Sequence, residues 1–110
     1  MGTLLYDGQA YEFEDRTLAH LQVIIGVKLR RAENFVLTWV VPAANGGGRH
    51  SIWVDNGVPI VFRYASSKIP SINRDWIETL ATSAGSTTGM IVTAEGTILP
   101  VPGEHGFPLE

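Results

Sequence analysis

Phe35–Val41 constrains the fold more than any other segment, because both of its faces are apolar. Phe, Leu, Trp and Val occupy alternate positions along it, and Val, Thr and Val fill the positions between them. Alternation with a period of two is typical of a β-strand, and a strand with two apolar faces lies inside a sheet that other elements cover. The sequence therefore predicts a central strand here, covered on one or both sides.

The N-terminal segment predicts a β-hairpin. Two alternating stretches, Thr3–Tyr6 and Gln9–Glu14, flank Asp7-Gly8, and both residues of this pair tolerate the positive φ of a tight turn. We expect the pairing to place four large apolar side chains on one face of the hairpin: Leu4, Tyr6, Tyr11 and Phe13.

Capping signals predict two helices. Asp15 fits an N-cap, and a helix should follow it over residues 16–31. Asn73 fits the cap of a second helix from Arg74 to about Ala84, which Gly85 should end. The residues at helical spacing in the second helix predict its buried stripe: Trp76, Ile77, Leu80, Ala81 and Ala84.

The remaining strands complete the predicted fold. Ser51–Asp55 and Val58–Ala65 flank Asn56-Gly57 and predict a second hairpin, with Pro59 indicating an edge position, and Met90–Ala94 predicts a last strand. The order is ββαβββαβ. The predicted class is therefore α+β: one domain over residues 1–97, with two helices and an antiparallel or mixed sheet of about five or six strands.

Composition excludes several classes of protein and site. The chain has no Cys, so disulfides, thiolate chemistry and Cys-based metal sites are excluded. The longest apolar run, Val23–Val27, is far shorter than a membrane span, and the start lacks a signal-peptide pattern. We therefore expect a cytoplasmic protein without a membrane partner. Residues 98–110 should form a Pro/Gly-rich tail, whose final Leu109-Glu110 is typical of a tag remnant.

Positive charge is concentrated in the middle of the chain. Seven of the eight Lys and Arg residues lie between Lys28 and Arg74, against only Glu33 and Asp55, although the formal net charge of the chain is −3. Such a basic strip favours a local anion, a nucleic acid or an acidic protein as a partner. The predicted binding residues, including one tryptophan that could stack on a base, are Lys28, Arg30, Arg31, Arg49, Trp53, Arg63, Lys68 and Arg74. In the predicted second hairpin, Trp53 and Arg63 lie on neighbouring strands, where they would form a stacking surface beside each other.

The first predicted helix has two apolar faces. One is the expected core stripe, and the other comprises His20, Val23, Ile24 and Val27, with Arg30 and Arg31 at its rim. This second face either packs against the second helix or the tail, or it forms a homodimer interface or a groove for a partner. Gly26 costs the helix about 0.5–1 kcal/mol relative to Ala, and the close approach of another backbone is one reason to keep it.

The glycine-rich segment Gly46–His50 is the most phosphate-like string, since glycines expose N–H groups and Arg49 could clamp an anion. A strand rather than a helix follows it, so neither a P-loop nor a dinucleotide loop is indicated. It is either a flexible hairpin loop or part of an enzyme remnant that binds a phosphorylated small molecule. The three histidines are isolated from one another, so no metal site, no catalytic base and no cofactor is predicted.

Four blocks of residues carry a family resemblance: Leu18-Ala19-His20-Leu21-Gln22, Lys28-Leu29-Arg30-Arg31, Ser51-Ile52-Trp53 and Pro70-Ser71-Ile72-Asn73-Arg74-Asp75-Trp76-Ile77. In order and spacing they resemble an uncharacterised family of roughly hundred-residue actinobacterial proteins, often given the automated label ATP-dependent DNA ligase. The resemblance covers most of residues 1–85 and implies no catalytic residues.

The residues do not support the ligase label. DNA ligases transfer a nucleotide through a lysine in a Lys-x-Asp-Gly motif. Here Leu-Arg-Arg follows Lys28 and Ile-Pro-Ser follows Lys68, so neither lysine matches. We therefore predict a non-enzymatic binding or interaction module, with nucleic acid as the sharper ligand hypothesis and a protein partner or self-association as the safer one.

Overall fold

The computed structural model describes residues 1–85 and 89–96, and within them it contains six strands, two α-helices and one short 3₁₀ helix. The elements are β1 (Gly2–Tyr6), β2 (Gln9–Phe13), α1 (Asp15–Arg30), β3 (Phe35–Val40), η1 (Ala43–Asn45), β4 (Arg49–Val54), β5 (Ile60–Arg63), α2 (Arg74–Ala84) and β6 (Met90–Ile91). The predicted order and the α+β class are confirmed. The predicted tail over 98–110 lies outside the described residues.

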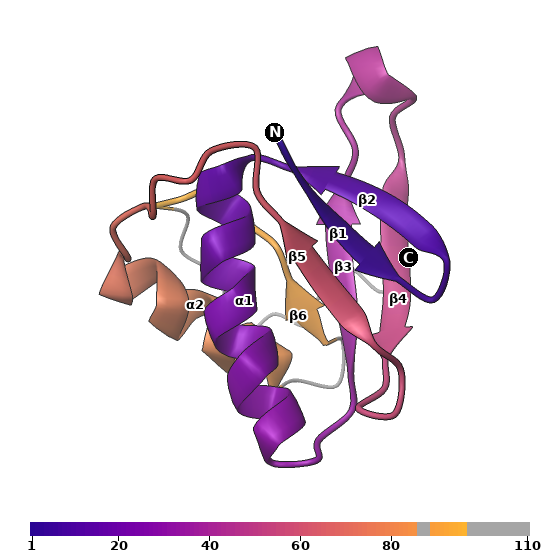
Figure 1. Cartoon of the computed structure of the whole chain (residues 1–110), viewed down its shortest axis with the longest axis vertical. Coiled ribbons are helices and arrows are strands. Elements are labelled where there is room, and N and C mark those ends of the chain that lie inside the picture. Colours follow the sequence, from indigo (N-terminus) through magenta and orange to yellow (C-terminus); the bar gives the residue numbers. More distant parts are fainter. Residues whose placement is uncertain (86–88, 97–110) are drawn as a thin grey trace, which may run out of the picture.

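The strands divide between two three-stranded sheets rather than forming one. One sheet has the order β2-β1-β5 and the other β4-β3-β6. The predicted central strand is confirmed, because β3 pairs antiparallel with β4 and parallel with β6. In Figure 1 the two sheets lie one behind the other, with α1 beside β5 and α2 behind α1.

The first predicted hairpin is confirmed. β1 and β2 pair antiparallel with Tyr6 opposite Gln9, and the turn residues Asp7 and Gly8 have φ angles of 51° and 79°. Leu4 and Tyr6 are buried, as the alternation predicted.

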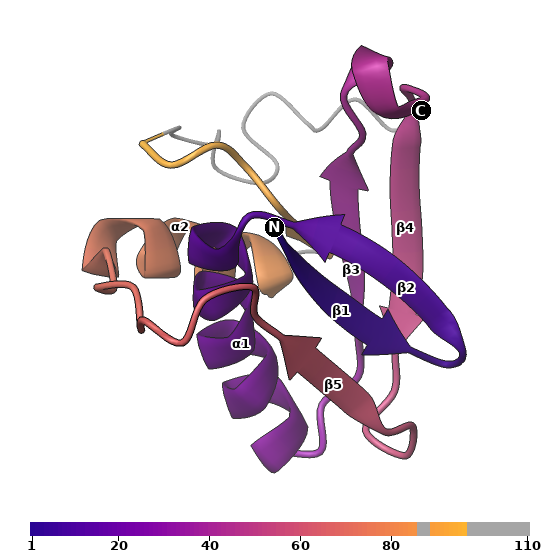
Figure 2. The same cartoon turned by 45° about the horizontal axis from the view of Figure 1, so that its top comes forward.

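The second predicted hairpin is wrong, because β4 pairs with β3 and β5 pairs with β1. The turn itself forms, with the Val58 N–H donating to the Asp55 carbonyl over 3.1 Å. However, the Tyr6 hydroxyl donates to the Trp53 carbonyl over 3.0 Å and accepts the Asp55 N–H over 2.7 Å. The end of β4 is thus bonded to β1, and the chain crosses between sheets at this turn, as Figure 2 shows.

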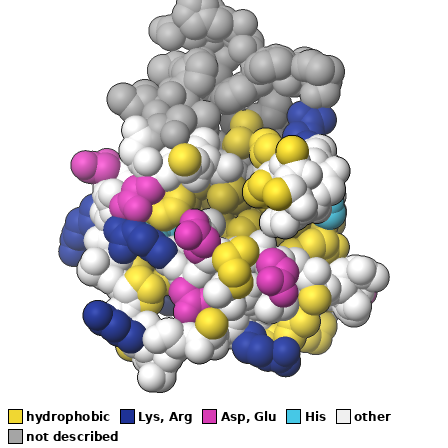
Figure 3. Space-filling model, turned by 90° about the horizontal axis from the view of Figure 1, so that it is seen from above, with side chains coloured by type: hydrophobic (Ala, Val, Ile, Leu, Met, Phe, Trp, Pro, Cys, Tyr) yellow, Lys and Arg dark blue, Asp and Glu magenta, His cyan; other side chains and the backbone are white. Residues whose placement is uncertain are grey.

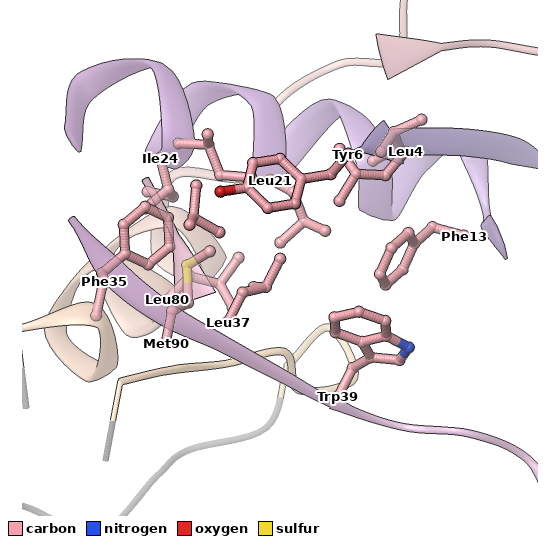
Figure 4. Close-up of a cluster of buried hydrophobic side chains, with 14 of the residues drawn as sticks. Leu4, Tyr6, Phe13, Leu21, Ile24, Phe35, Leu37, Trp39, Leu80 and Met90 are labelled. Atoms are coloured by element: carbon pink, nitrogen blue, oxygen red, sulfur yellow. The ribbon is translucent and has the colours of Figure 1, made fainter. Parts of the chain in front are cut away.

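The hydrophobic core lies where the two sheets and the two helices meet. In Figure 4, side chains from α1, β1, β2, β3, α2 and β6 converge on one cluster. From α1 the core receives Leu18, Leu21 and Ile25, none of which is accessible to solvent. The core stripe predicted for this helix is therefore confirmed.

Half of the second apolar face of α1 is also internal. His20 is fully buried and Ile24 is 4% exposed. The ring of Trp76, which belongs to α2, lies 4.5 Å from the His20 ring. The hypothesis of an open interface is therefore wrong for His20 and Ile24, because α2 covers them. Val27 is half-buried, and Val23 is exposed.

Two details of the predicted helices also differ. Glu14 rather than Asp15 is the N-cap of α1, and Asp15 is the first residue of the helix. Asn73 caps α2 as predicted, since its side chain accepts the N–H groups of Asp75 and Trp76. Ala81, predicted in the buried stripe of α2, is exposed.

Candidate functional site

A groove of about 850 Å³ lies between α1 and β5 and continues along the segment of residues 64–72. In Figures 1 and 2, α1 and β5 run side by side, and the segment after β5 crosses the first half of the helix. The helix contributes Ala19, Val23 and Gly26 to the lining, and the strand contributes Ile60 and Phe62. The groove is thus built from elements far apart in the sequence.

The lining is mainly apolar, and three of its aliphatic side chains are open to solvent. Val23 is 38% exposed, Ile72 is 43% exposed, and Ile69 is 87% exposed. A single exposed hydrophobic residue is common, but several gathered around one concavity make it a candidate binding site. Burying these side chains against a ligand would release about 25 cal/mol for each Å² of apolar surface removed from water.

Gly26 keeps the helix side of the groove open. A Cβ built on this glycine would meet nothing within 4 Å, so no contact inside the protein requires glycine here. The helix nevertheless carries the cost of a mid-helix glycine, about 0.5–1 kcal/mol. The space left by the missing side chain is part of the groove.

The segment that forms the far wall is held by the first turn of α1. The Asp15 carboxylate accepts the backbone N–H groups of Ala65 and Ser66 over 3.1 and 3.0 Å. These two bonds stabilise the ionised carboxylate and lower the pKa of Asp15 below its usual value. The Tyr64 hydroxyl donates to Gln22, and burial raises the pKa of Tyr64.

A second set of polar contacts holds the end of the same wall. Arg16 donates twice to Glu95, over 2.8 and 2.7 Å, and once to the Ser71 carbonyl over 2.8 Å. The Asn73 side-chain amide also donates to Glu95, over 2.7 Å. The bonds from Arg16 and Asn73 lower the pKa of Glu95 to about 2, and the same pairing raises the pKa of Arg16.

His20 ties this network to the interior. Its Nε2 accepts the Asn73 N–H over 2.9 Å, so the proton of the ring is on Nδ1, which donates to the Arg16 carbonyl over 2.7 Å. The imidazole is therefore a neutral structural link between α1 and the start of α2. Sequence analysis missed Asp15, Arg16 and Glu95 as supports of the site. The available signal was that two of the resembling blocks, residues 18–22 and 70–77, meet here.

The charge of the groove differs from that of the whole chain. Of the described residues that line it, Arg30 and Lys68 are the charged ones, whereas the net charge of the chain is −3. Arg30 is the last residue of α1, and Lys68 belongs to the segment that the first turns of the helix hold. The two cations thus lie toward opposite ends of an apolar groove.

Comparison with known families assigns the chain. The family described as a domain of unknown function (DUF7882) matches residues 1–95. The chain belongs to this family. The match spans the whole groove, including the Arg16–Glu95 contacts that support its wall. Comparison with curated proteins and with solved structures finds no match.

Most of the predicted basic strip is dispersed over this DUF7882 domain. Lys28 forms an ion pair with Glu33 over 3.1 Å, Arg31 caps α1, and Arg63 and Arg74 lie on β5 and at the start of α2. Arg49 is opposite Val40, the last residue of β3, about 17 Å along the strand from its start. Figure 3 shows the Lys and Arg side chains of one face at separate positions, with acidic side chains between some of them. Of the predicted cations, the groove brings together only Arg30 and Lys68.

Trp53 does not join a cationic platform. It lies on β4 and is 59% exposed, but Arg63, predicted beside it, lies in the other sheet. The expected stacking surface of Trp53 and Arg63 on neighbouring strands is therefore wrong, because β4 and β5 do not pair.

Of the Gly46–His50 segment, the three glycines connect η1 to β4, and Arg49 and His50 are the first residues of β4. The N–H groups of Gly46 and Gly47 donate to the Ala43 and Pro42 carbonyls, so they are turned into the loop rather than toward a ligand. The His50 ring packs 5.5 Å from the Trp39 ring. In residues 1–85 and 89–96, no group of three His, Asp or Glu side chains is placed to hold a metal ion, and no helix there has the length and apolar character of a membrane span.

Proposed function

We propose that this domain is a non-enzymatic protein-interaction module and that the α1–β5 groove is its working surface. The ligand is an apolar segment of a partner protein that carries acidic residues. The observation that carries this proposal is the lining: exposed aliphatic side chains between Arg30 and Lys68, without a carboxylate among the described lining residues. Charge complementarity of this kind selects acidic partners and speeds their association.

The arrangement of the cations favours a peptide over a nucleic acid. Affinity for nucleic acid comes mainly from several Lys and Arg side chains that neutralise successive phosphates. Here Arg49, Arg63 and Arg74 lie on three different elements, and Lys28 is already paired with Glu33. An apolar groove with one cation near each end provides apolar contacts for a hydrophobic segment but few cations for a chain of phosphates.

The same lining argues against catalysis in the groove. General acid–base chemistry needs a titratable side chain within reach of the reacting atom. The described lining contains no histidine and no carboxylate, and its titratable side chains are Tyr64, whose hydroxyl donates to Gln22, and the cations Arg30 and Lys68. The predicted enzyme remnant at Gly46–His50 likewise gains no support, since the N–H groups of Gly46 and Gly47 are occupied by carbonyls of the loop.

Fluorescence polarisation tests the proposal with three labelled probes. The first is a peptide of about eight alternating valine and glutamate residues, longer than the groove. The second replaces each glutamate with lysine, and the third is a single-stranded oligonucleotide. We expect the acidic peptide to bind with a Kd on the order of 1–100 μM and the basic peptide to bind at least about tenfold more weakly. Equal binding of the two peptides, or tighter binding of the oligonucleotide, would contradict the proposal.

Two variants locate the binding surface. Val23→Glu places a carboxylate in the groove and should weaken binding of the acidic peptide by at least about tenfold. Val40→Glu makes the same substitution at a side chain on β3 that is 72% exposed, outside the groove, and should leave the Kd unchanged. Circular dichroism of both variants verifies that they are folded. Equal losses in the two variants would place binding elsewhere.

A further inference from the structure

β5 presents an unpaired edge to the groove. In the described part of the chain the order of its sheet is β2-β1-β5, so β5 is an edge strand that pairs with β1 on one side. Its other side lies beside α1 (Figure 1). An edge strand exposes backbone N–H and C=O groups that can pair with a further strand.

The register shows which backbone groups of β5 face that edge. A Cβ built on Gly2 would lie 2.8 Å from the Arg63 carbonyl oxygen, so this carbonyl points toward β1. Arg63 is opposite Thr3, and Val61 is opposite Leu5. Because successive residues of an antiparallel strand direct their N–H and C=O groups to opposite sides, the backbone groups of Val61, two residues before Arg63, also point toward β1. Ile60 and Phe62 therefore direct theirs to the open edge.

We infer that the ligand binds as an added β-strand, paired with the backbone of Ile60 and Phe62 and covered on its other side by α1. This inference rests on the proposed function and specifies the form in which the peptide binds. Strand addition uses main-chain hydrogen bonds for affinity and side-chain pockets for specificity. The missing side chain of Gly26 gives the added backbone room to approach the helix.

The dimensions of the groove set the length and charge of the added segment. The lining of α1 runs from Ala19 to Arg30, a rise of about 16 Å, which is the length of about five extended residues. β5 itself has four residues and follows Pro59, so its edge is short and unsuited to extended aggregation. The segment is therefore about five extended residues long, with apolar side chains against the groove and carboxylates within reach of Arg30 and Lys68.

Backbone methylation of the acidic peptide tests the strand geometry. Two versions carry N-methyl groups on alternate residues, one on the valine nitrogens and one on the glutamate nitrogens. In an added strand only alternate N–H groups face β5, so one version should lose at least about tenfold in affinity while the other stays near the unmodified peptide. Similar affinities for the two versions, whether retained or lost, would overturn the inference.

Hydrogen exchange supplies an independent readout on the protein. Saturating peptide should slow exchange of the Ile60 and Phe62 amides by at least about tenfold, and leave the Val61 and Arg63 amides, which face β1, unchanged. The two failures are distinguishable. Absence of binding by the unmodified acidic peptide overturns the proposed function, whereas binding without protection at Ile60 and Phe62 overturns the added strand alone.

Discussion

The two sides of α1 carry similar apolar residues, but one side is buried and the other is exposed to solvent. On the side toward α2, His20 and Ile24 are buried, and both ring nitrogens of His20 are hydrogen-bonded. On the side toward β5, Val23 is exposed and Gly26 leaves empty space. An apolar helical face therefore joins the core where another element covers it, and stays accessible to a ligand where no element does.

The polar network explains why the two sides differ. Asp15 and Arg16 hold residues 65–71 across the first turns of the helix, and His20 holds Asn73 at the start of α2. These bonds draw α2 onto one side of α1. On the other side, β5 and residues 64–72 line the groove, and Val23 remains exposed in it.

The largest expected difference between the two sides is in stability. Ile24→Glu buries a carboxylate without a partner and should lower the free energy of unfolding by about 3–5 kcal/mol, or unfold the domain. Val23→Glu, one residue away on the open side, should change it by less than about 0.5 kcal/mol. Urea unfolding followed by circular dichroism measures both. Comparable losses in the two variants would mean that the open side is closed in solution.

His20→Ala should have the next largest effect. It leaves the Asn73 N–H and the Arg16 carbonyl without their partner and opens a cavity against Trp76, so we expect a loss of about 2–4 kcal/mol. The exposed His50 provides a matched control, and His50→Ala should cost less than about 1 kcal/mol. If both variants unfold at the same urea concentration, His20 is not the link between the helices.

Acid should loosen the wall of the groove before it disrupts the core. The pKa of Glu95 is about 2 in the folded protein against a usual value of 4.5, so its contribution to stability is complete above about 4.5 and is lost as the pH falls toward 2. The free energy of unfolding should therefore decrease over this range. Glu95→Gln should show a shallower decrease in the same urea titrations, and an unchanged slope would contradict the role of Glu95.

Gly26→Ala should give a small change in stability, and of opposite sign. The new methyl group meets no atom within 4 Å and removes the helix cost of glycine, so thermal unfolding should show a gain of about 0.5–1 kcal/mol. The same methyl group occupies the groove, so the acidic peptide should bind more weakly. A variant that is both more stable and equally tight in binding would show that Gly26 does not face the ligand.

Local signals predicted the elements of this fold well, and long-range contacts explain where they failed. Asp7-Gly8 and Asn73 act through neighbouring residues, and both do what the sequence predicted. Asn56-Gly57 also forms its turn, but the flanking strands pair with β3 and β1 instead of with each other. Tyr6 of β1, some fifty residues away in the sequence, is hydrogen-bonded to the end of β4. A local turn signal carries no information about such long-range strand pairings.

The candidate site was predictable in its parts but not in its assembly. Charge clustering selected Arg30 and Lys68, and the helical pattern selected Val23, together with many residues that do not join them. The cost of Gly26 led us to expect the close approach of another backbone, but within the described residues a Cβ built there would meet nothing within 4 Å. What sequence reasoning lacked was the position of β5, because the wrong second hairpin placed that strand beside β4 instead of beside α1.

Mapping the acidic peptide on the folded domain by NMR tests the central claim most directly. Amide chemical shifts of the isotope-labelled full chain are followed during titration with the valine–glutamate peptide. The account predicts that the largest changes fall on residues 19–30, on β5 and on residues 66–72, with little change along β4. Changes centred on Arg49 and Trp53 of β4, with the α1–β5 groove unaffected, would contradict it.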